Sequence, residues 1–133
     1  MVIAKGHRLA RRRTIQVTEL ADDPVIWMRR QLHPILHDRF LAWCKQQGYS
    51  PNITQQVTSI SEALDFAGEG LGVAFVKASV SRLHSDGLAF IQLANPGFVL
   101  STGMICANTC NSPVLEKLIN SAQARFHCAA VSE

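Results

Sequence analysis

Two adjacent arginines and two hydroxyl residues are the side chains of this chain best suited to holding a small anion. Arg29 and Arg30 follow an apolar run typical of a buried strand, and Thr58 and Ser59 follow a second, more exposed strand. In an open α/β sheet, ligands bind beyond the carboxyl ends of the strands, near helix N-termini. Guanidinium groups and hydroxyls facing one cleft there favour an anion such as a carboxylate. The alternative is that the arginines are solvated and the hydroxyls only cap a helix, and for the arginines the two interpretations are equally supported.

Histidine and cysteine occur at spacings that could bind a metal, but they form no recognisable ligand set. His33 and His37 are four residues apart, on one helix face, yet Pro34 stands where a zinc-protease motif needs Glu. A composite zinc site would need partners from the last third of the chain, whose spacing matches no ligand pattern: Cys106, Cys110, His127 and Cys128. We therefore expect no metal and no other cofactor.

Other catalytic signatures are missing from the sequence. The glycine-rich stretch G-E-G-L-G at 68–72 follows a predicted helix and precedes a strand, whereas a dinucleotide loop follows a strand and precedes a helix. No G-x-S-x-G nucleophile motif occurs. Asp65 and Glu69, four residues apart, are expected on a solvated helix surface. The sequence therefore predicts that the chain is not an enzyme.

The length and composition indicate one ordinary globular domain. The chain has 133 residues, of which 47% are hydrophobic and 17% charged, and this balance excludes a disordered chain. No apolar run reaches the roughly 18 residues needed to span a bilayer, and the first residues lack the apolar segment of a signal peptide. The four cysteines are irregularly spaced, which favours free thiols. We expect a cytoplasmic protein without membrane contact.

Positive charge gathers near the start of the chain. Residues 1–30 hold seven lysines and arginines against three acidic residues. Such a basic segment could touch nucleic acid. However, Arg11, Arg12 and Arg13 form one short run without interleaved aromatic residues or a reading helix, so we expect no direct DNA contact by this chain.

The hydrophobic pattern predicts strands alternating with helices. Strands are expected at 2–4, 25–28, 53–57, 71–76, 88–93 and 99–107. Helices are expected at 34–47, 60–68, 78–83 and 113–128, with one further helical turn at 18–21. Gly48 is suited to end the first helix, and Ser59 with Glu62 matches a capping box that begins the second. This alternation predicts an α/β fold with a mostly parallel sheet flanked by helices.

Four stretches resemble, in the same order, motifs of LysR-type transcriptional regulators. The first is G-H-R-L-A-R-R-R-x-I-x-V-x-E-L-A-D-D-P at 6–24, and the second is P-I-L-H-D-R-F-L-A-W-C-K-Q-Q-G-Y-S-P at 34–51. The third is Q-V-T-S-I-S-E-A-L-D-F-A-G-E-G-L-G-V-A-F-V-K-A-S at 56–79, and the last is N-S-P-V-L-E-K-L-I at 111–119. Each motif is loose, but the ordered series covers nearly the whole chain. One departure is Lys77, where the family usually has proline.

The resemblance implies an effector-binding domain of the type II periplasmic-binding-protein kind, with an inducer between two α/β subdomains. Residues 24–100 would form the second subdomain, and residues 1–23 and 101–133 would belong to the first. Carried over residue by residue, the ligand-facing positions are Arg29, Arg30, Thr58, Ser59, Ile60, Phe75 and Val76. The resemblance also implies a homo-oligomer, a dimer or tetramer, in which helix 34–47 and strand 53–57 contact a second protomer.

Two functions follow as hypotheses. In the first, the chain is the inducer-sensing module of a LysR-type regulator, binds a carboxylate or aromatic acid, and controls DNA binding by a winged helix-turn-helix domain that lies outside these residues. In the alternative, it is a truncated, free-standing association module that pairs with intact regulator subunits. That module should expose apolar surface around 99–107 and 115–119, where the missing subdomain would sit.

Overall fold

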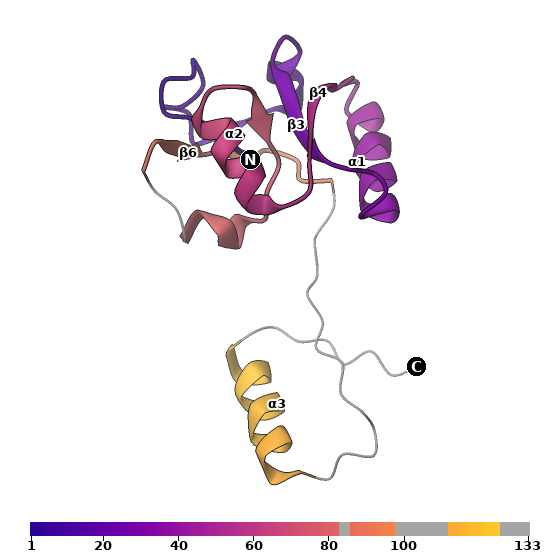
Figure 1. Cartoon of the computed structure of the whole chain (residues 1–133), viewed down its shortest axis with the longest axis vertical. Coiled ribbons are helices and arrows are strands. Elements are labelled where there is room, and N and C mark those ends of the chain that lie inside the picture. The colour runs from indigo at the N-terminus through magenta and orange to yellow at the C-terminus, as the bar shows by residue number, and fades with distance from the viewer. Residues whose placement is uncertain (83–85, 98–111, 126–133) are drawn as a thin grey trace. The chain divides into compact units, whose positions relative to one another are not determined.

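The computed structural model describes residues 1–82, 86–97 and 112–125. The chain divides into two compact units, residues 1–100 and 101–133. The described part of the second unit consists of helix α3 (Pro113–Arg125) with the residue before it, and every described strand lies in the first unit (Figure 1). Within the described ranges, no helix combines the length and the apolar character needed to cross a membrane.

Five strands form the main sheet of the first unit, in the spatial order β4-β3-β5-β1-β6. Their bounds are β1 Val2–Ala4, β3 Pro24–Met28, β4 Asn52–Val57, β5 Val73–Ala74 and β6 Leu88–Phe90. Strand β3 is parallel to both of its neighbours, whereas β1 is antiparallel to β5 and β6. Strands β2 (Thr14–Ile15) and β7 (Gln92–Leu93) form a separate parallel pair. The predicted α/β class with a mostly parallel sheet is confirmed.

Helices α1 (Pro34–Gln46) and α2 (Ile60–Gly68) cover opposite faces of this sheet. Successive residues of a strand point to opposite faces, so both faces of β3 need an apolar cover. Val25 and Trp27 pack in one core with Phe40 of α1, and Ile26 packs in the other with Leu64 of α2. In Figure 1 the two helices lie on either side of β3 and β4. The predicted strand at 25–28 is therefore buried on both faces.

Local signals fix where the two helices begin and end. Pro34 occupies the first turn of α1, where its missing N–H costs no hydrogen bond. Gly48 ends α1 with φ of +69°, and the Gly48 and Tyr49 N–H groups donate to carbonyls of the last turn. Helix α2 begins after Ser59, whose Oγ accepts a hydrogen bond from the Glu62 backbone N–H at 3.1 Å. These predicted caps are confirmed.

Several predicted elements are shorter or divided. The strand expected at 71–76 is limited to Val73–Ala74, the residues that pair with β3 and β1. The helix expected at 78–83 is the 3-10 helix η2 (Ala78–Arg82). The strand expected at 88–93 splits into β6 and β7 because β6 pairs with β1 and β7 pairs with β2. The predicted strand at 99–107 and the predicted end of the last helix at 126–128 lie outside the described residues.

The first residues of the chain belong to the middle of the main sheet. Val2 and Ile3 are fully buried, one in each core, because β1 lies between β5 and β6. The Met1 amino group donates a hydrogen bond to the Ile91 carbonyl at 2.8 Å. The resemblance assigns residues 1–23 to the other subdomain, whereas the structure packs them in the same unit as 24–100. Where the subdomain boundary lies in a complete effector domain stays a prediction.

Candidate ligand-binding site

The parallel strands bring the predicted ligand-binding positions to one edge of the sheet. Strands β3, β4 and β5 run in the same direction, so their carboxyl ends share an edge. Met28, the last residue of β3, is paired with Val57, the last of β4, and the Arg29 N–H donates to the Val57 carbonyl at 3.0 Å. The chain segments at 29–30, 58–60 and 75–76 all leave from this edge. Whether these residues contact a ligand stays a prediction, but the fold brings the chain segments that carry them to one edge of the sheet.

Arg30 is engaged in an ion pair on the protein surface. Its Nε and Nη2 donate to the two carboxylate oxygens of Asp38, each at 2.9 Å. These hydrogen bonds lower the pKa of Asp38 and raise the pKa of Arg30. Two of its five N–H donors are engaged and its charge is paired, so Arg30 is a weaker candidate for holding a ligand anion than an arginine without a carboxylate partner.

Arg29 differs from its neighbour in having an uncommitted side chain. Its guanidinium is exposed and forms no hydrogen bond or ion pair within the described ranges of the chain. Its charge contributes to a lowered pKa of Glu62, a residue of α2, and its backbone N–H is bonded to Val57, the residue before Thr58. Arg29 is therefore the strongest anion-binding candidate at this edge.

The two hydroxyl residues before α2 are used within the protein. Oε2 of Glu62 accepts hydrogen bonds from the Thr58 backbone N–H at 2.7 Å and the Thr58 hydroxyl at 3.0 Å. The Ser59 hydroxyl accepts from the Glu62 N–H. The capping-box prediction had Glu62 reaching back, and the structure shows that it reaches Thr58, one residue before the helix cap. The hydrogen bonds from Thr58 are the main cause of the lowered pKa of the Glu62 carboxyl.

Apolar residues line the same edge. Ile60 is 40% exposed, and Phe75 and Val76 are half-buried. The Phe75 ring lies 4.9 Å from the Phe40 ring, which in turn stacks on Trp27 at 4.0 Å. The Phe75 ring therefore packs with the core under α1, whereas Ile60 begins α2, which covers the other face of the sheet. Contact of Phe75 with a ligand stays a prediction.

The histidines of α1 do not assemble a metal site. Among the described residues, no three metal-ligating side chains cluster together. His33 is exposed and precedes the first residue of the helix, and His37 lies with its Nδ1 3.7 Å from Asp38. The predicted cysteine and histidine partners of a composite zinc site lie outside the described residues.

A shallow hollow of about 410 Å³ lies elsewhere, at the other end of α1. It is lined by Leu41, Lys45, Gly48, Tyr49, Ser50 and Pro51. These residues precede β4, whereas Thr58 follows it, so the hollow is at the opposite edge of the sheet. It contains none of the predicted ligand-binding residues.

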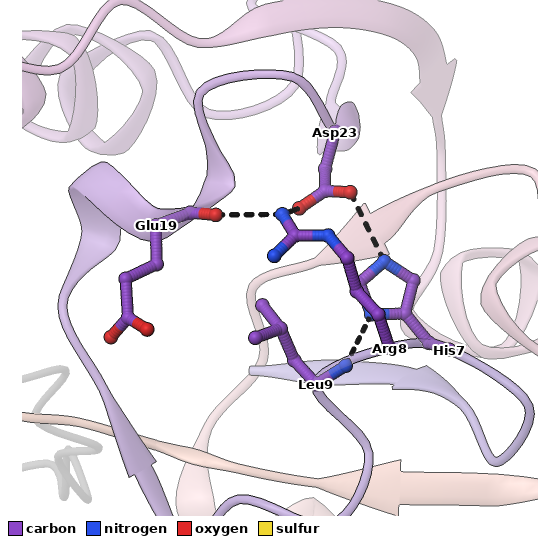
Figure 2. Close-up of polar contacts among 5 residues, drawn as sticks. All are labelled: His7, Arg8, Leu9, Glu19 and Asp23. Carbon is purple, nitrogen blue, oxygen red and sulfur yellow. Dashed lines mark hydrogen bonds and ion pairs between the residues drawn. The ribbon is translucent and has the colours of Figure 1, made fainter.

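A charged cluster that the sequence analysis did not identify anchors the start of β3 (Figure 2). Asp23, which is only 8% exposed, accepts hydrogen bonds from Arg8 Nη2 at 2.7 Å and pairs with His7 Nε2 at 3.1 Å. Arg8 Nη2 also donates to the Glu19 carbonyl at 2.7 Å. The Leu9 N–H donates to His7 Nδ1, which leaves Nε2 as the nitrogen that carries the proton toward Asp23. The cluster holds His7 and Arg8 to Asp23, the residue that directly precedes β3.

Comparisons with known proteins agree on one family. The model of the LysR substrate binding domain matches residues 1–127. The HTH-type transcriptional regulator AlsR of Bacillus subtilis is 30% identical over 85 residues, which are 64% of this chain and 28% of that protein. The chain spans about a third of the length of the curated relatives it matches. These relatives are regulators of transcription, in agreement with the prediction that the chain is not an enzyme.

Two solved structures share the fold at low sequence identity. The effector-binding domain of BenM with its effector benzoate has a TM-score of 0.62 at 17% identity, covering 72% of this chain and 44% of that one. The effector-binding domain of QuiR in complex with shikimate has a TM-score of 0.61 at 18% identity, covering 93% of this chain and 58% of that one. At these identities the likeness establishes the effector-domain fold.

Proposed function

Because the chain belongs to the LysR substrate-binding-domain family, we propose that it senses a small-molecule inducer and thereby controls DNA binding by a separate winged helix-turn-helix domain. The observation that carries this proposal is the shared sheet edge, where the backbone of Arg29 is hydrogen-bonded to Val57, just before the residues that begin α2, and where the chain leaves β5 at Phe75. A ligand that binds one arrangement of a regulator better than another shifts the population toward it. The domain would act in the cytoplasm, where regulators meet DNA.

The ligand class that fits this edge is a carboxylate, including an aromatic acid. A guanidinium forms its strongest hydrogen bonds with carboxylates and phosphates. BenM and QuiR are named with benzoate and shikimate, which are both ring-bearing carboxylates, and this supports the same class here. We therefore choose these two acids as probes.

Ligand titration of the purified chain tests the proposal, with backbone amide NMR shifts as the readout. We expect saturable shifts at Arg29, Ile60 and Phe75 with at least one of the two acids. Arg29→Ala should weaken binding by about fivefold or more, because it removes the uncommitted cation. Arg30→Ala is the matched control and should change affinity by less than about twofold, since Asp38 already occupies that guanidinium. Absence of saturable binding, or equal losses in the two variants, would contradict the proposed site.

We also propose that the domain assembles with copies of itself through α1 and β4. Strand β4 is at the edge of the sheet, and Ile35 and Leu41 of α1 are 75% and 37% exposed. Light scattering across a dilution series should give a dimer, and Ile35→Asp should shift it to monomer. A chain that is monomeric at every concentration would contradict this surface.

The alternative association-module function stays a prediction. Its expected apolar surface around 99–107 lies outside the described residues. In α3, Val114 and Leu118 are 75% and 56% exposed. Mixed light scattering with an intact regulator of this family would test the alternative directly.

A further inference from the structure

The Glu62 side chain occupies the polar donors that a ligand would meet first at the start of α2. One oxygen, Oε2, takes both the Thr58 N–H at 2.7 Å and the Thr58 hydroxyl at 3.0 Å. Glu62 lies on the first turn of α2, so its own negative charge also meets the positive end of that helix. The protein thus already places a carboxylate at the position where the sequence analysis expected an external anion.

This arrangement limits which residues can bind the charged group of a ligand. Thr58 has given both of its donors to Glu62, and the Ser59 hydroxyl accepts from the Glu62 N–H. Nε and Nη2 of Arg30 donate to the Asp38 carboxylate. Of the predicted polar positions in the described residues, Arg29 forms no side-chain hydrogen bond or ion pair, and Ser59 keeps its hydroxyl hydrogen as a donor.

We propose that Glu62 is a specificity-determining residue of this site: it keeps the carboxylate of a ligand away from Thr58 and directs it to Arg29. The inference rests on the proposed function, because it concerns the same ligand. A second carboxylate beside Glu62 would bring two like charges together, and their repulsion disfavours binding there. A neutral ligand of the same shape meets no such repulsion. Glu62 would therefore discriminate between charged and neutral ligands and set the orientation of a charged one.

The test compares benzoate with benzamide, its neutral counterpart of nearly the same shape, in four proteins. These are the unaltered chain, Glu62→Ala, Glu62→Gln and Glu69→Ala. Glu69→Ala is the matched control, because it removes the same charge from the opposite end of α2, where Glu69 is exposed and has no role in the Thr58 hydrogen bonds. Affinity and the Thr58 backbone N–H shift are read from the same NMR titrations.

In Glu62→Ala we expect benzoate to bind about fivefold or more tightly and to shift the Thr58 N–H, because the repulsion is gone and the donors are free. In Glu62→Gln, which keeps an oxygen for Thr58 but loses the charge, we expect a gain of about two- to fivefold. Benzamide in every variant, and benzoate in Glu69→Ala, should change by less than about twofold. If Glu62→Ala does not fold, the Glu62→Gln comparison decides alone.

The outcomes separate this inference from the proposed function. Benzoate that binds the unaltered chain but gains nothing in the Glu62 variants overturns the inference and leaves the function standing. Benzoate that binds only the Glu62 variants contradicts carboxylate sensing by the unaltered chain, and it overturns the inference as well, because Glu62 would then block the ligand and not direct it to Arg29. If no protein of the set binds benzoate, both are overturned. Equal gains in Glu62→Ala and Glu69→Ala would show a general charge effect and also overturn the inference.

Discussion

Removing the Asp23 carboxylate should loosen the attachment of the 7–23 segment to strand β3. Asp23 pairs with Arg8 at 2.7 Å and with His7 at 3.1 Å, and it is the one buried charged residue in the described part of the chain. Asp23→Ala therefore leaves two donors without their acceptor. The neighbouring Asp22 is exposed and supplies a matched control, because Asp22→Ala removes the same charge without touching the cluster.

The expected magnitude lies between the values for exposed and buried ion pairs. The Asp23 side chain is 11% exposed, but the Arg8 side chain is 53% exposed, so solvent screens one partner. Exposed pairs contribute about 0–1 kcal/mol, whereas breaking a buried pair costs about 3–5 kcal/mol. We expect Asp23→Ala to lower the free energy of unfolding by about 2 kcal/mol, Arg8→Ala by about 1 kcal/mol, and Asp22→Ala by less than about 0.5 kcal/mol.

Urea unfolding of the single variants and of the Arg8→Ala, Asp23→Ala double variant measures the coupling between the two residues. A coupling energy of about 1 kcal/mol is expected, decreasing with added salt because Arg8 is half-exposed. A coupling below about 0.3 kcal/mol would refute the reasoning, since it would mean that the two side chains contribute independently. An equal cost for Asp22→Ala and Asp23→Ala would refute it as well.

Three further predictions concern other parts of the first unit. Cys44 is fully buried, and burial raises the pKa of its thiol to about 12. Iodoacetamide at pH 8 should therefore label Cys44 in urea but not in the native chain, as read by peptide mass spectrometry. Rapid labelling of the native chain would contradict this burial. A Cβ at Gly72 would lie 2.6 Å from the Pro24 carbonyl oxygen. Gly72→Ala should therefore lower the free energy of unfolding in urea by about 1–3 kcal/mol. Unchanged stability would argue against this close approach. Burial lowers the pKa of the Met1 amino group from 8.0 to about 6, so the folded state binds fewer protons than the unfolded state between these values. Stability should therefore fall by roughly 2 kcal/mol as the pH is lowered from 8 to 6, and a flat profile in the chain with a free amino group would contradict this.

The sequence predicted those parts of the fold that depend on short-range signals. Ser59 and Gly48 mark helix ends through their own side chain or backbone conformation, and both are confirmed. The strand around Ile26 follows from an unbroken apolar run. The central position of Val2–Ala4 was not predictable in this way, because three residues show no period and their partners lie in distant strands.

The candidate site shows the same limit. The sequence presents Arg29 and Arg30 as equivalent neighbours, and only the fold distinguishes them by bringing Asp38 of α1 against Arg30. The sequence does show a basic residue before α1 and an acidic residue within it. It does not show which arginine pairs with Asp38, because several pairings are possible. Glu62 was recognised as a capping residue, yet its bond to Thr58 depends on the turn between β4 and α2, which residue types alone do not determine.

The position of β1 has a consequence for synthesis of the protein. Ala4 is paired with Leu88, so the middle of the sheet cannot close until roughly 80 further residues have been made. At about 5–20 residues per second, translation leaves the apolar Val2 and Ile3 without their native partners for about 4–16 s. Chaperones that hold nascent chains have that interval in which to bind them.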